Sequence, residues 1–128
     1  MATRLVPRMA PKRERRREPR IDERIALAIR DASAELTTET KNLSASGAYC
    51  TLDRFIPPMS KLQLRFELPN VGARRTKISC TGVVVRVEPV ITNLDRGHYH
   101  VAVLFMELSV RDRAAIARFI RQRLSMSP

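Results

Sequence analysis

A strict alternation of apolar and polar side chains runs through the middle of the chain and points to a fold built from β-strands. It is clearest in residues 61–68, where charged or polar side chains separate apolar ones at every second position: Leu62, Leu64, Phe66 and Leu68. Successive side chains of a strand face opposite sides of a sheet. This segment is therefore expected to bury one face in a core and to expose the other.

Five further segments carry strand signals. They are residues 24–30, 34–41, 48–53, 78–87 and 98–106. The turn-forming residues at 42–47 are expected to connect the second strand to the third. We expect Gly82 to mark a bulge, the stretch 83–85 to be buried on both faces, and the strand at 98–106 to lie deep in the sheet.

The last segment changes to a helical period. Apolar residues recur there at helical spacing, namely Ile116, Phe119, Ile120 and Leu124. Ser109 and Asp112 have the form of a capping box, which predicts a helix that starts near Val110. With 128 residues, a single domain is the default. We therefore predict an all-β fold, a six-stranded antiparallel β-barrel with one C-terminal α-helix, because closure removes exposed sheet edges.

Basic residues dominate the N-terminus. The formal net charge is +11, and residues 1–20 hold eight Arg or Lys against two Glu, so more than half of the net charge lies there. A field of this sign attracts nucleic acid, anionic lipid or phosphorylated small molecules. We predict a flexible basic tail at 1–11 and a single domain at 12–124, which comprises an arginine-motif segment at 12–23, the barrel at 24–107 and the helix at 109–124.

The remaining residues argue against several functions. No apolar run approaches the roughly 18 residues of a membrane-spanning helix and no signal peptide is evident, so we expect a cytoplasmic protein. Cys50 and Cys80 lie in strand-like segments and are expected to be buried free thiols. His98 and His100 share one face of a strand, but no further ligand pattern completes a zinc set. Without a nucleophile–base pair or a phosphate-binding glycine loop, we expect no enzyme, no metal and no cofactor.

Two short motifs carry the functional prediction. The first has the spacing RRxxxR and consists of Arg15, Arg16 and Arg20. The second has the spacing NxSxxG and consists of Asn42, Ser44 and Gly47. In this order and separation the two motifs resemble the PilZ domain family. The resemblance extends over residues 12–124 through the strand order and the terminal helix, and it implies a six-stranded barrel that binds cyclic di-GMP, a bacterial second messenger.

The resemblance also implies roles for the arginines. Arg15 and Arg16 would contact a phosphate or the Hoogsteen edge of a guanine, and Arg20 would hold a guanine or phosphate across the barrel rim. We rank Arg16 and Arg20 above Arg15. The planar guanidinium suits this ligand, because it grips phosphate oxygens or the paired O6 and N7 acceptors of guanine with two parallel hydrogen bonds.

The resemblance also implies that the second motif contacts the ligand from the barrel. By resemblance, Asn42 would accept hydrogen bonds from guanine, Ser44 would offer its hydroxyl, and Gly47 would leave room for close approach. Asn42 stands where aspartate is frequent in the family, so it lacks the charge-assisted acceptor. Arg86 is a further candidate, for stacking on a guanine face.

The predicted function is a cyclic di-GMP-binding receptor or adaptor, which changes conformation on binding and regulates an unidentified effector protein in motility, biofilm or exopolysaccharide machinery. The alternative is a nucleic-acid-binding small β-barrel with a basic tail. The chain has no Trp and few aromatic residues for base stacking, which counts against this alternative. A third possibility is a PilZ-like scaffold that binds proteins alone, although such a scaffold has no need of the two motifs.

Overall fold

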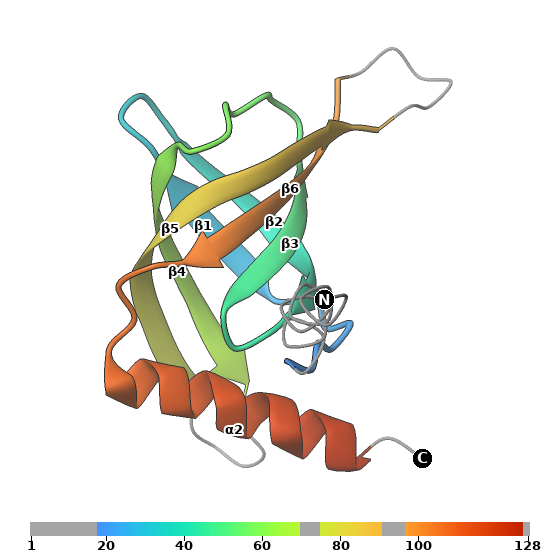
Figure 1. Cartoon of the computed structure of the whole chain (residues 1–128), viewed down its shortest axis with the longest axis vertical. Helices are drawn as coiled ribbons and strands as arrows, with labels where there is room; N and C mark the ends of the chain where they lie inside the picture. The colour runs from blue at the N-terminus through green and yellow to red at the C-terminus, as the bar shows by residue number, and fades with distance from the viewer. Residues whose placement is uncertain (1–17, 70–74, 91–96, 127–128) are drawn as a thin grey trace, which may run out of the picture.

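A computed structural model describes residues 18–69, 75–90 and 97–126 of the chain (Figure 1). In these ranges it contains six strands and one helix: β1 (Ala26–Arg30), β2 (Glu35–Leu43), β3 (Gly47–Leu52), β4 (Lys61–Pro69), β5 (Arg75–Pro89), β6 (Tyr99–Phe105) and α2 (Val110–Met126). The predicted tail at 1–11, together with Arg15 and Arg16, lies outside the described residues.

The six strands close into a barrel in the order β1-β2-β3-β6-β5-β4, and each neighbouring pair is antiparallel. The alternation in β4 explains its place in the wall, since every second side chain is buried and the intervening ones are exposed. The predicted fold class, a six-stranded antiparallel barrel with a C-terminal helix, is confirmed.

Helix α2 lies across one end of the barrel (Figure 1). Ile116, Phe119 and Ile120 on its inner face join the apolar core of the barrel. Ser109 Oγ accepts a hydrogen bond from the Asp112 backbone N–H at 3.0 Å, which confirms the capping interaction and the start at Val110. Leu124, predicted to share this face, is 44% exposed. No helix in the described part of the chain is long and apolar enough to cross a membrane.

Three predictions about the inner strands were wrong. Gly82 does not form the bulge of β5; that irregularity falls between Val84 and Arg86. A side chain at Gly82 would instead meet Leu64 and Val103, so this glycine permits tight packing. Because the bulge turns one residue outward, Val85 is 50% exposed although Val83 and Val84 are buried.

The deep position predicted for the sixth strand was also wrong. Val101, Val103 and Phe105 are buried, but Leu104 is 39% exposed on the opposite face. The reason is the barrel geometry, because the wall of this barrel has one core side and one outer side. Met106, just beyond the strand, is 45% exposed as well.

Both cysteines are buried free thiols, as predicted. Burial in the apolar core raises the pKa of the Cys50 thiol to about 12. The pKa of Cys80 rises to about 11, chiefly through burial and also through the negative charge of Asp112. Both groups are therefore protonated at neutral pH.

Candidate functional site

The segment that precedes β1 docks on the end of β2. The Ile21 N–H donates to the Leu43 carbonyl at 3.0 Å, and the Leu43 N–H donates to the Ile21 carbonyl at 2.9 Å. Both side chains point into the core, with Ile21 8% exposed and Leu43 fully buried. This two-residue bridge fixes the positions of the neighbouring residues Arg20 and Asn42 on the outside of the barrel.

The two predicted motifs meet through Arg20 and Asn42. Arg20 Nη1 donates a hydrogen bond to Asn42 Oδ1 at 3.2 Å. Arg20 is exposed and Asn42 is half-buried. A guanidinium carries five N–H donors, and Asn42 is its one hydrogen-bonding partner among the described residues. An exposed guanidinium of this kind is suited to an anionic or acceptor-rich ligand.

Asn42 lies in a strand, whereas the sequence predicted it in a turn. It belongs to β2 and pairs with Tyr49 of β3. A register shift between Thr40 and Asn42 precedes it. The buried Thr40 and the half-buried Asn42 therefore present opposite faces, and the actual turn is confined to residues 44–46.

Ser44 builds that turn. Its hydroxyl oxygen accepts hydrogen bonds from the backbone N–H groups of Ser46 and Gly47, each at 3.2 Å. Its own N–H donates to the Gly47 carbonyl at 2.9 Å. Ser44 is only 1% exposed, so its side chain supports the loop from within and does not face solvent. The turn is also tied to the preceding segment, because Ser46 Oγ donates to Glu18 Oε1.

Gly47 permits the close approach of β3 to β6. A Cβ atom at this position would clash with the Val103 carbonyl oxygen of β6. The sequence prediction assigned Gly47 to ligand approach, but the described contact is one between two strands of the barrel. Only glycine leaves that backbone contact intact.

A row of side chains crosses the outer wall beside this turn. Asn42, Tyr49, Ala102 and Arg86 are successive register partners on β2, β3, β6 and β5. Directly opposed residues share one face of a sheet, so all four project outward. Tyr49 is half-buried and its ring stacks on His100 at 5.5 Å between centroids. The sequence reasoning missed Tyr49, and its period-two position relative to Cys50 is the signal that would have placed it outside.

The histidine pair does not gather a metal-binding set. His100 contacts Thr51 through Nδ1 at 3.3 Å and stacks on Tyr49. No cluster of three or more His, Cys, Asp or Glu side chains suited to a metal is found across residues 18–69, 75–90 and 97–126.

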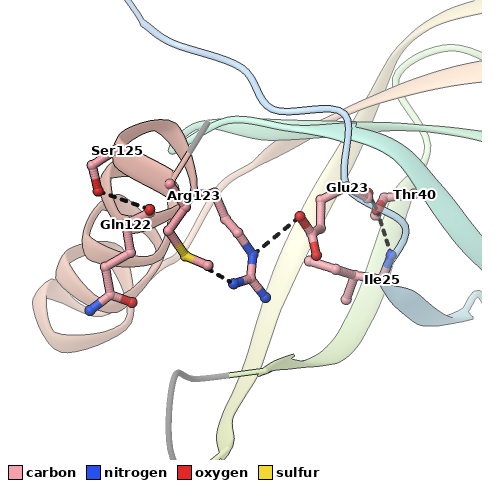
Figure 2. Close-up of polar contacts among 7 residues, drawn as sticks. Glu23, Ile25, Thr40, Gln122, Arg123 and Ser125 are labelled. Atoms are coloured by element: carbon pink, nitrogen blue, oxygen red, sulfur yellow. Dashed lines mark hydrogen bonds and ion pairs between the residues drawn. The ribbon is translucent and has the colours of Figure 1, made fainter. Parts of the chain in front are cut away.

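The arginine segment is also connected to helix α2 (Figure 2). Thr40 Oγ1 accepts a hydrogen bond from the Ile25 N–H at 3.0 Å and donates to the Glu23 carbonyl at 2.6 Å. The Glu23 carboxylate in turn pairs with Arg123 Nε of the helix at 3.2 Å. Arg123 also lies over the Phe119 ring, 4.7 Å from its centroid. The chain that leads from Arg20 into the barrel is thus held on both sides.

Comparison with known proteins identifies this arrangement. The family model described as PilZ domain matches residues 14–122. No curated protein matches the chain.

Several solved structures share the fold at low identity. The inhibitor of motility MotI/DgrA of Bacillus subtilis has a TM-score of 0.72 and 21% identity over 87% of this chain and 52% of its own. The K. pneumonia MrkH–c-di-GMP complex has a TM-score of 0.68 and 15% identity over 85% and 51%. The PilZ domain of YcgR from Escherichia coli, with c-di-GMP, has a TM-score of 0.61 and 15% identity over 88% and 99%. The chain thus spans about half the length of MotI and MrkH.

Proposed function

The chain belongs to the PilZ domain family, and on that premise we propose that it is a cyclic di-GMP receptor that transmits ligand binding to a partner protein. The observation that carries the proposal is the hydrogen bond between Arg20 and Asn42, which joins the two motifs on the outer surface. The PilZ domain of YcgR, which shares the fold, is described with c-di-GMP.

The proposed site combines groups suited to both parts of the ligand. Arg20, with Arg15 and Arg16 from the preceding segment, supplies guanidinium groups for phosphates and for the acceptor edge of guanine. Asn42 supplies an amide for guanine donors. Tyr49, its register partner, offers a ring on which a guanine would stack. Arg86 of β5 lies in the same row but three strands away from Asn42. We therefore propose that it contacts only the part of the ligand that is farthest from Asn42.

Ser44 and Gly47 complete the proposed site from beneath. Their role is to shape the turn at residues 44–46, which follows the β2 segment that carries Asn42, since Ser44 is buried and Gly47 packs against β6. A substitution at either position is expected to weaken binding by moving the turn.

We further propose that the protein is an adaptor without catalytic activity, resident cofactor or metal, and that it acts in the cytoplasm. Among proteins of this fold, MotI is described as an inhibitor of motility and MrkH as a c-di-GMP-dependent transcription regulatory factor. The description of MotI supports motility as the regulated process. Biofilm and exopolysaccharide machinery are proposed on the family resemblance alone. The division into a tail at 1–11 and a domain at 12–124 stays a prediction.

Titration calorimetry tests the proposed function against the nucleic-acid alternative. The protein is titrated with cyclic di-GMP, GMP, GTP and a short DNA duplex at about 150 mM salt, where exposed charges are screened beyond about 8 Å. We expect micromolar or tighter binding of cyclic di-GMP, about 8 kcal/mol or more, and much weaker binding of the mononucleotides. A DNA affinity that exceeds the cyclic di-GMP affinity, and that falls steeply as salt rises, would favour the alternative.

A further inference from the structure

A basic groove lies on the wall of the barrel, and none of its lining residues belongs to the β2–β3 turn. Its volume is about 540 Å³ and it extends over parts of β1, β4 and β5. Small residues line its middle, among them Ala26 and Ala28 of β1 and Ser79 of β5. Long basic side chains line it as well, namely Arg24, Arg65, Arg75 and Lys77.

The groove forms where β1 and β4 separate from each other. Their pairing extends from Arg30 and Gln63 to Leu27 and Phe66, and within the described residues it goes no further. Ala26 still pairs with Glu39 of β2, so the start of β1 stays with β2 while β4 continues beside β5. The β1-facing edge of β4 beyond Phe66 therefore has no partner strand in the described ranges. This edge is short and ends at Pro69, which has no backbone N–H, so it offers few backbone groups to an added strand.

The lining of the groove carries a net positive charge. Its four basic side chains face a single carboxylate among the lining residues, Glu67. Glu67 pairs with Arg75 at 3.5 Å, and Arg65 pairs with Glu35 at 2.5 Å, both on the exposed surface. Within the described ranges, Arg24 and Lys77 lie within ion-pair distance of no carboxylate. Exposed pairs are worth at most about 1 kcal/mol, so a ligand carboxylate can replace either of them.

We propose that this groove binds an acidic, extended segment of the partner protein. The inference rests on the proposed adaptor function, because it names where and how the partner is recognised. Charge complementarity favours Asp and Glu side chains, and the small residues of the lining leave room for an extended backbone. Nucleic acid fits less well, because the one aromatic residue of the lining, Phe66, is 5% exposed and offers no stacking surface.

The proposal is tested by fluorescence anisotropy on the full chain with a labelled peptide probe. The probe consists of about ten alternating glutamate and threonine residues, enough to span the groove as a strand. A lysine–threonine peptide and a single-stranded DNA of similar length serve as comparison probes. The measurements are made at about 150 mM salt, both without and with saturating cyclic di-GMP.

Three variants test whether the acidic peptide binds in the groove. Arg24→Gln combined with Lys77→Gln removes two exposed charges from the groove and should weaken binding of the acidic peptide about tenfold. Arg111→Gln combined with Arg118→Gln removes the same charge from the exposed face of α2 and should leave binding within about twofold. Ala26→Gln keeps the charge but projects into the groove, and it should also weaken binding. Circular dichroism and thermal unfolding verify that each variant is folded.

The outcomes separate this proposal from the proposed function. The groove variants should retain cyclic di-GMP affinity, and Arg20→Ala should retain binding of the acidic peptide. Equal losses in the groove and α2 variants, an unaffected Ala26→Gln variant, or no peptide binding in either ligand state would overturn the groove proposal and leave the receptor proposal standing. If DNA binds more tightly than the acidic peptide and depends on the same residues, the groove binds nucleic acid and not a partner protein.

Discussion

Arg20 and Asn42 are joined by a hydrogen bond of 3.2 Å from Nη1 to Oδ1, although 22 positions separate them in the sequence. The backbone bridge between Ile21 and Leu43 holds them together from the side of the core. The contact therefore places a guanidinium donor and an amide beside each other, and this arrangement would lower the ordering cost of the proposed ligand contacts at these two side chains.

Substitution of Arg20 by alanine should weaken cyclic di-GMP binding while preserving the fold. Loss of a charge-assisted contact costs about 2 kcal/mol, or roughly thirtyfold in affinity. Calorimetry measures the affinity, and thermal unfolding measures the stability. Arg30→Ala is the matched control. Arg30 is an exposed arginine at the end of β1 that is farther along the chain from Arg20. If Arg20→Ala lost as much stability as affinity, Arg20 would be a structural residue.

Substitution of Ser44 by alanine should destabilise the protein. The change leaves the half-buried N–H groups of Ser46 and Gly47 without the hydroxyl acceptor, at a cost of about 1 kcal/mol. Urea unfolding measures the loss. Ser79→Ala, at an exposed position of β5, should change the free energy of unfolding by less than about 0.5 kcal/mol. A Ser44 variant that binds weakly at unchanged stability would instead point to direct ligand contact.

Substitution of Gly47 by alanine should also destabilise the barrel, because the new Cβ meets the Val103 carbonyl and forces β3 away from β6. Overpacking of this kind costs about 1–3 kcal/mol. Gly97→Ala provides the control, since the nearest atom to its Cβ would be a Tyr99 side-chain carbon at 3.7 Å. Equal stability of the two variants in thermal unfolding would contradict the assigned role of Gly47.

The ion pair between Glu23 and Arg123 should stabilise the attachment of α2. Both side chains are about one quarter exposed, so we expect a coupling free energy of only about 0.5–1 kcal/mol in a double-mutant cycle of Glu23→Gln and Arg123→Gln. Arg121→Gln, on the exposed side of the same helix, should show no coupling to Glu23. A coupling indistinguishable from zero for the Glu23–Arg123 pair would rule out its contribution.

The buried thiols predict a loss of stability at high pH. Their pKa values of about 12 for Cys50 and about 11 for Cys80 exceed the ordinary value of 9.0. Below pH 9 the thiols are protonated in both the folded and the unfolded protein, so burying them carries no ionisation penalty. As the pH rises above 9, the thiols of the unfolded protein ionise first, and the free energy of unfolding falls until the pH reaches the pKa values of the folded protein. The free energy of unfolding should therefore fall between pH 9 and 11, and less so in a Cys50→Ala/Cys80→Ala variant. An equal fall in both proteins would contradict this assignment.

The strands and the helix were predictable because a period of two and a period of 3.6 are properties of consecutive residues. The bulge at Val85 was not, because a bulge depends on the register with β6, which no local pattern contains. For the same reason the sequence missed Tyr49, whose place beside Asn42 follows from strand pairing. The motif residues were identified as candidates, but their burial separates Arg20 and Asn42, which face solvent, from Ser44, which supports the turn.

Cyclic di-GMP is proposed to bind between the arginine segment and the β2–β3 turn. Backbone amide hydrogen exchange, measured with and without saturating cyclic di-GMP, tests this binding site. We expect protection to rise at Arg13–Arg20 and at Asn42–Gly47, while exchange of the buried core amides of β4 and β5 stays unchanged. Unchanged exchange in both segments at saturating ligand, or new protection confined to another face of the barrel, would contradict it.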